Sequence, residues 1–276
     1  MSYKTIVAYL SRTDGVRDVM NVALPLARKH SGHLVGVHVY SGVPVVGTIG
    51  AQVPAEIIEQ YAQSMREDAD AIGAAFNKCV DGETLQTEWR RQEQKVIGTD
   101  ILNMISEQVR CSDIVVMGQA DSEQRVGELT ADIILSAGRP VIVVPEKAPE
   151  TDLSGKVLVA WDGSREAARA AFDALPLLKL AKSVIIATIQ KHKTSAVDSG
   201  GADFALCLAR HGVKAEATTV KAKGSTHQAL AELAADKDCE LIVMGCYGHS
   251  RLRERLFGGA TRGMLQKMSL PVLMSH

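Results

Sequence analysis

The chain contains one pattern twice, and this duplication constrains its fold more than any other feature. Four short pieces recur in the same order in the two halves. They are YKTIVAY and GKVLVAW (3–9 and 155–161), the tetrad ALPL (23–26 and 174–177), DIVVMG and ELIVMG (113–118 and 240–245), and RPVIVV and LPVLMS (139–144 and 270–275). Repetition in a fixed order indicates two copies of one structural unit.

Within each copy, short apolar runs alternate with alanine-rich stretches of helical spacing. Runs of this kind predict buried strands at 5–10, 33–39, 85–91, 113–118 and 140–144, and again at 157–161, 184–189, 214–220, 241–245 and 271–274. Strands that alternate with helices form right-handed crossovers and a mainly parallel sheet. We therefore predict an α/β fold with five strands in each half.

A polar linker, EKAPETDLSG at 146–155, separates the two copies. The 276 residues exceed the commonest domain size of about 100–150 residues, which favours two domains. We place these domains at 1–150 and 151–276.

The two halves differ in their middles. The first half has a Gly/Pro-rich loop at 41–54 and a long amphipathic segment with six apolar residues near helical spacing, whereas the second half has the shorter segment 191–212 in this place. The six apolar residues are Ile57, Ile58, Tyr61, Met65, Ala69 and Ile72. A helix that packs on the sheet accounts for this pattern.

Bulk composition excludes several classes of protein. Lys plus Arg number 31 against 32 Asp plus Glu, so no overall field attracts nucleic acid. No apolar run approaches the roughly 18 residues of a membrane span, and the first residues lack the layout of a signal peptide. The five cysteines include no C-x-x-C pair, which is typical of reduced thiols. We expect a cytoplasmic protein that binds neither nucleic acid nor membrane.

Residues 245–261 read GCYGHSRLRERLFGGAT, and two structures fit this glycine-rich stretch. Its glycines form turns, or they expose backbone N–H groups that cradle an anion. Gly245 ends a predicted strand, and ligands of open parallel sheets bind outside strand ends where the strand order reverses. Position therefore favours an anion site.

Asp162 ends another predicted strand across the same crevice. A carboxylate there can accept hydrogen bonds from ribose hydroxyls, or it can cap the helix that begins near Ser164. Both roles remain open at this point.

The pattern G-x2-G-x9-G at Gly245, Gly248 and Gly258, together with Asp162 and the final run PVLM, resembles the universal stress protein family in its tandem two-domain form. The resemblance covers essentially the whole chain, weakly in the first half and strongly in the second. It implies two tandem Rossmann-like domains, each a mainly parallel five-stranded sheet flanked by helices. In nucleotide-binding members it also implies an ATP site.

The same resemblance assigns the adenosine end of this site. Asp162 would hold the ribose and the adenine edge, and Ile189 would meet adenine through its backbone. Gly245 and Gly248 would face the ribose and the α-phosphate.

At the phosphate end, Gly258 and Gly259 would face the outer phosphates. The family pattern has Ser or Thr where this chain has Gly259, so a hydroxyl is missing there. Thr261 is expected to supply the substitute. ADP and AMP therefore stay beside ATP as candidate ligands, with or without Mg²⁺.

The first half departs from the pattern at two positions. Leu10 stands where the second half has Asp162, and Asp121 stands where it has Gly248. Because a carboxylate at that place would repel phosphate, we expect one adenine nucleotide site per chain. The first domain would be a scaffold that pairs with the second as a pseudo-dimer through the last strands. A homodimer of whole chains is a further partner that we consider.

Two other functions remain as alternatives to a nucleotide-responsive stress regulator. One is a slow ATP-hydrolysing enzyme with His249 or Asp162 as base. The other is a nucleotide-free interaction or apolar-ligand module that uses the loop at 41–54.

The sequence contains no metal-spaced cluster and no Ser-His-Asp order, so we assign neither catalytic residues nor a metal site. Cys246 leaves redox sensing open, and His227 and His249 are expected to be surface or capping residues.

Overall fold

A computed structural model describes the protein at residues 2–42, 54–95, 100–119, 126–190, 200–222, 224–246 and 259–276. The first half contributes the strands β1 (Thr5–Tyr9), β2 (His33–Ser41), β3 (Thr87–Gln94), β4 (Ile114–Gly118) and β5 (Val141–Val144). The second half contributes β6 (Lys156–Ala160), β7 (Ser183–Gln190), β8 (Ala215–Lys221), β9 (Cys239–Gly245) and β10 (Val272–Ser275).

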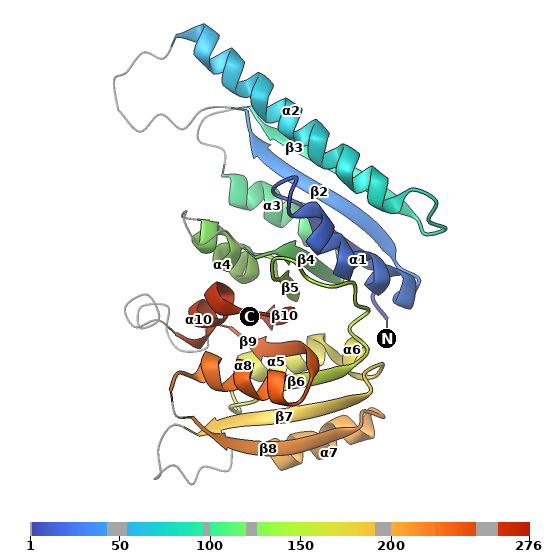
Figure 1. Ribbon diagram of the computed structural model, residues 1–276, viewed down its shortest axis with the longest axis vertical. Coiled ribbons are helices and arrows are strands. Elements are labelled where there is room, and N and C mark those ends of the chain that lie inside the picture. Colours follow the sequence, from blue (N-terminus) through green and yellow to red (C-terminus); the bar gives the residue numbers. More distant parts are fainter. Residues whose placement is uncertain are drawn as a thin grey trace.

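All of these strands form one continuous sheet in the order β3-β2-β1-β4-β5-β10-β9-β6-β7-β8 (Figure 1). Within each half every pair of neighbouring strands is parallel. The halves meet where β10 pairs antiparallel with β5, with Leu273 opposite Ile142. The α/β fold with a mainly parallel sheet is therefore confirmed.

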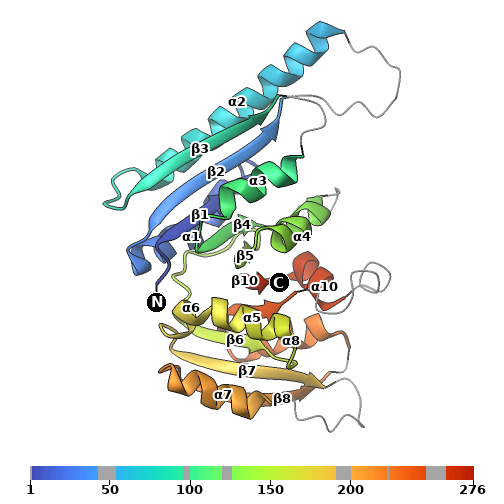
Figure 2. The ribbon, with the colours of Figure 1, turned by 180° about the vertical axis from the view of Figure 1, so that it is seen from behind.

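Helices cover both faces of the sheet (Figure 2). One layer contains α1 (Val16–His30), α2 (Ala55–Val80), α5 (Arg165–Asp173), α6 (Leu175–Leu178) and α7 (Gly201–Arg210), and the other contains α3 (Ile101–Val109), α4 (Val126–Ser136), α8 (Thr226–Asp236) and α10 (Ala260–Lys267). Each layer packs on its own apolar core, and each core draws residues from both halves. Two cores form because successive side chains along each strand point to opposite faces of the sheet.

The long helix α2 departs from the predicted apolar stripe at its beginning. Ile57 and Ile58 are 52% and 37% exposed, and the buried residues of α2 start at Ala62. A helix of 26 residues spans about 39 Å, whereas the nine residues of β2 span about 30 Å. The first turns of α2 consequently project beyond the sheet (Figure 1).

The repeated ALPL tetrad folds differently in its two copies. In the first half Pro25 lies inside the continuous helix α1. In the second half α5 ends at Asp173 and the short helix α6 follows with Pro176 in its first turn. A proline is tolerated at a helix start because its missing N–H has no intrahelical partner there.

The linker is held against the first half. The backbone N–H of Thr151 donates to the carbonyl oxygen of Asn21 at 3.0 Å, and the Asn21 side chain donates to the carbonyl of Ala148 at 2.7 Å. Lys29 pairs with Asp152 at 2.9 Å. These contacts fix the path of the chain between the two halves.

Candidate functional site

The candidate site lies where the strand order of the second half reverses. Strand β6 has β7 on one side and β9 on the other, and Val159 of β6 is in register with Val243 of β9. Asp162 follows the end of β6, and Gly245 is the last residue of β9. The structure therefore brings these two predicted residues to neighbouring strand ends, where ligands of open parallel sheets bind.

Gly245 has a packing reason to be glycine. A β-carbon at this position would lie 2.5 Å from the amide nitrogen of Ala167 and 2.7 Å from the carbonyl oxygen of Glu166. Any side chain would thus collide with the backbone of the first turn of α5. The bare backbone of Gly245 lets the end of β9 approach the N-terminus of that helix.

Asp162 shapes the turn that leads into α5. Its Oδ1 accepts a hydrogen bond from the backbone N–H of Ser164 at 2.9 Å, and Gly163 between them has a φ of 76°. The hydroxyl of Ser164 in turn accepts from the N–H of Ala167 at 3.2 Å and caps the helix. The Asp162 side chain is exposed, so it faces solvent at the crevice while it orders this turn.

Ile189 lies next to the last residue of β7, the other neighbour of β6. Its half-buried side chain packs on the core that also contains α8 and α10. The backbone of Ile189 is in register with Val220 of β8. Its place at a strand end agrees with the expected position, and its contact with adenine stays a prediction.

The predicted phosphate end is described only in part. Gly259 is the N-cap of α10, and no side chain caps that helix among the described residues. Thr261 lies in the first turn of α10 and is only 3% exposed, which leaves little of it within reach of a ligand. Gly248 and Gly258, with His249, lie outside the described residues.

The position of α10 depends on a contact that the sequence did not reveal. A β-carbon on Gly263 would lie 2.7 Å from Cγ of His227, so the imidazole ring fits against the bare backbone of α10. Burial and the charge of Lys267 lower the pKa of His227, which keeps the ring neutral. His227 is thus a packing residue between α8 and α10. A glycine inside a helix is costly, and Gly263 could have signalled this close approach.

Glu166 is a buried carboxylate beside Gly245, and it too was missed in the sequence. It is 4% exposed and pairs with Arg165. Burial opposes its ionisation, but hydrogen bonds from Arg165 and from its own backbone, together with the charges of Arg165 and His276, lower its pKa. An ionised carboxylate in the first turn also stabilises the N-terminus of α5.

Among the described residues, little space remains in the corresponding crevice of the first half. Leu10, the counterpart of Asp162, is only 1% exposed. The cavity beside it measures about 20 Å³, which holds one water molecule and no nucleotide. Gln119 follows β4 and donates through Nε2 to the carbonyl of Leu265 in α10 at 2.8 Å, so this strand end contacts the second half instead. Asp121 lies outside the described residues.

Other candidate groups give no second site. Cys246 is 1% exposed, and its thiol donates to the carbonyl of Ser275 at 3.3 Å. Among the described residues, no group of His, Cys, Asp and Glu is arranged to hold a metal ion. The described helices also include none with the length and apolar character needed to cross a membrane.

Comparisons with known proteins find universal stress proteins as relatives. The model of the universal stress protein family matches residues 154–276. Universal stress protein Slr1230 of Synechocystis sp. is 29% identical over 174 residues, which cover 58% of this chain and 57% of the relative. Universal stress protein MJ0577 of Methanocaldococcus jannaschii is 33% identical over 51 residues, or 18% of this chain and 32% of the relative. The chain thus spans little more than half of the first relative and a third of the second.

A solved structure matches the fold over nearly the whole chain. The crystal structure of a universal stress protein from Archaeoglobus fulgidus superposes with a TM-score of 0.67 at 15% identity. The match covers 98% of this chain and 95% of that one. The second half of this chain, residues 154–276, thus matches the universal stress protein family, and the chain shares its fold with a solved universal stress protein.

Proposed function

We propose that the second domain, residues 151–276, binds ATP or a related adenine nucleotide and that the protein acts as a stress-response regulator. The first domain, residues 1–150, serves as a scaffold. One nucleotide binds per chain, and the location is cytoplasmic.

The observation that carries this proposal is the meeting of Asp162 and Gly245 at the switch point between β6 and β9. An exposed carboxylate there suits ribose hydroxyls, and the N-terminus of α5 beside it favours an anion. Gly248, Gly258 and Gly259 would complete the site at the phosphates, and Ile189 would contact adenine.

The single site is supported by the contrast between the two halves. The family model covers only residues 154–276, and the matching crevice of the first half has room for about one water molecule. The antiparallel pairing of β5 with β10 supports a pseudo-dimer in which the first half stabilises the second.

A regulator suits the described chemistry better than a fast enzyme. His227 is packed under α10, and Glu166 is buried and paired with Arg165, so neither is placed as a general base. Any ATP hydrolysis would therefore be slow, and Mg²⁺ would be held mainly by the phosphates.

The test is calorimetric titration of nucleotide-stripped protein with ATP and Mg²⁺. We expect one site per chain in the wild type and at least about a tenfold weaker affinity in Asp162→Asn, because a charge-assisted hydrogen bond is lost. The asparagine keeps an oxygen that can accept from Ser164, so helix α5 and the free energy of unfolding should be preserved.

Two further variants test the phosphate end and the choice of domain. Gly248→Asp should abolish binding, whereas Asp121→Asn in the first half should leave binding unchanged. A wild type that binds no adenine nucleotide would refute the proposal, and two equivalent sites per chain would refute the scaffold role of the first half.

A further inference from the structure

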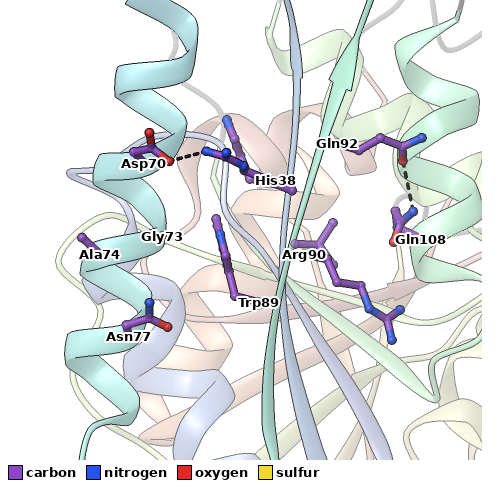
Figure 3. A pocket seen from close by; sticks show the side chains of 11 residues that line it. His38, Asp70, Gly73, Ala74, Asn77, Trp89, Arg90, Gln92 and Gln108 are labelled. Atoms are coloured by element: carbon purple, nitrogen blue, oxygen red, sulfur yellow. Dashed lines mark hydrogen bonds and ion pairs between the residues drawn. The ribbon is translucent and has the colours of Figure 1, made fainter.

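The outer edge of β3 borders a groove of about 830 Å³. In the described part of the chain β3 is the outermost strand at its end of the sheet. Side chains from both faces of β3 line the groove, with Asp70, Trp89 and Asn77 on the α2 side and Arg90, Gln92 and Gln108 on the α3 side (Figure 3). A space that straddles an edge strand suits another strand better than a compact small molecule.

The backbone of β3 presents alternate residues to this groove. The carbonyls of Gln86 and Gln94 accept from Leu34 and Gly42 on the β2 side, so even-numbered residues face β2. In an extended strand the next residue turns its N–H and C=O the other way. Trp89, Arg91 and Glu93 therefore direct their backbone groups to the outer edge, where a further strand can pair with them.

Trp89 gives this edge a fixed aromatic platform. Its ring stacks on Phe76 with centroids 5.5 Å apart. A β-carbon on Gly36 or on Gly73 would lie 2.8 Å from the Trp89 ring, so both glycines are needed to seat it. The ring remains half-buried, with part of its surface turned to the groove.

The charges along β3 complement themselves when the strand is reversed. Glu88 and Arg90 lie on either side of Trp89, and within the chain they form an ion pair at 2.7 Å. In an antiparallel pair centred on Trp89, each Glu88 faces the Arg90 of the other strand. Centres on Glu88 or on Arg90 would instead place like charges opposite each other, which is unfavourable.

We propose that two copies of this chain associate through the β3 edge, as antiparallel strands related by a two-fold axis at Trp89. Trp89 then pairs with its symmetry mate, and Thr87 with the partner's Arg91. Such residues exchange two backbone hydrogen bonds per pair. The interface is isologous, because the same surface is used by both copies.

Helix α2 is compatible with this arrangement. It lies over β2 and β3, and the small residues Gly73 and Ala74 line the groove at the level of Trp89. Across the two-fold axis the two α2 helices run antiparallel and approach each other at these small residues. Helices pack at 8–10 Å, and small side chains permit the lower end of that range.

The first test compares two substitutions of one residue by sedimentation velocity and light scattering. Arg91→Ala removes the ion pair with Asp70 but keeps the backbone N–H. Arg91→Pro removes the same side chain and also the outward N–H, while the ladder with β2 stays intact. We expect a dimer for the wild type and Arg91→Ala, and a folded monomer for Arg91→Pro, with circular dichroism as the check on folding.

The second test exchanges charges and fixes the register. Glu88→Arg alone places two arginines opposite each other, and Arg90→Glu alone places two glutamates opposite each other, so each variant should be monomeric. Mixed in equal amounts, the two variants should form a heterodimer. A monomeric wild type at all accessible concentrations, a dimeric Arg91→Pro, or a mixture that stays monomeric would each overturn the proposal.

Discussion

The amide nitrogen of Ala167 lies 2.5 Å from the position that a β-carbon on Gly245 would occupy. This relationship joins the end of β9 to the first turn of α5, at the strand end where we place the nucleotide. A side chain at position 245 would therefore displace the start of α5 and change the proposed nucleotide crevice.

Gly245→Ala should disturb both stability and binding. The added methyl group meets backbone, which cannot move aside as a flexible side chain can, so we expect the free energy of unfolding to fall by about 1–3 kcal/mol. ATP affinity should fall with it, because α5 must shift. Urea denaturation and calorimetry measure the two effects.

The first half offers a matched control for that substitution. Gly118 is the repeat counterpart of Gly245, and a β-carbon there would meet only Val19 Cγ2, at 3.6 Å. Gly118→Ala should change the free energy of unfolding by less than about 0.5 kcal/mol. Equal effects of the two substitutions would contradict the asymmetry between the crevices.

Acid should destabilise the fold through His30. This residue is 4% exposed and lies against Tyr3 with ring centroids 5.0 Å apart. Burial lowers its pKa, and the charges of Lys4, Lys29 and the N-terminus lower it further. The unfolded chain therefore binds a proton before the native state does, so stability is lost as pH falls below about 6.5.

The measurement is the free energy of unfolding between pH 7.5 and 5 in wild type and His30→Gln. One histidine contributes a slope of at most about 1.4 kcal/mol per pH unit, and the variant should lose that contribution. His211→Gln is the control, because His211 is exposed at the end of α7. An unchanged slope in His30→Gln would assign the acid sensitivity elsewhere.

Tyr3 ties the first strand to the second half. Its hydroxyl donates to the carbonyl oxygen of Asp173 at 2.7 Å. Burial, then the charges of Asp173 and Asp113, raise the Tyr3 pKa well above its usual value, so the donor proton is retained. Tyr3→Phe should lower the free energy of unfolding by about 0.5–1.5 kcal/mol, within a single cooperative transition. Tyr61→Phe is the control: Tyr61 lies half-buried on α2, and its substitution should have little effect on the free energy of unfolding.

Thiol accessibility tests the redox alternative. Cys111 is exposed, whereas Cys246 is buried beside Ser275. Under native conditions a maleimide reagent should modify Cys111 rapidly and Cys246 only when the protein unfolds. Mass spectrometry of timed samples distinguishes the two, and rapid labelling of Cys246 would reopen a sensing role for that residue.

Much of the fold could be read from periodicity. Each of the ten predicted runs overlaps an observed strand, and the central strands are the most apolar because both of their faces are buried. The edge strand was the least accurate: β3 covers Thr87–Gln94, three residues beyond the predicted end at 91. The residues of β3 are mostly polar, because an outermost strand is only partly buried and does not need a continuous run of apolar side chains.

The candidate site was predictable in position but not in detail. Asp162 and Gly245 follow from strand ends and the reversal of strand order. The backbone contact of Gly245, the fit of His227 against Gly263 and the buried Glu166 arise from packing between segments far apart in the sequence. No local pattern encodes such contacts.

The junction of β5 with β10 also bears on how such a chain can evolve. Two identical subunits that met through these strands would always share every mutation, and each would keep or lose a ligand site together. Joining the halves in one polypeptide removes that symmetry. Leu10 can then be buried at one strand end while Asp162 stays exposed at the other, and selection can act on each half independently.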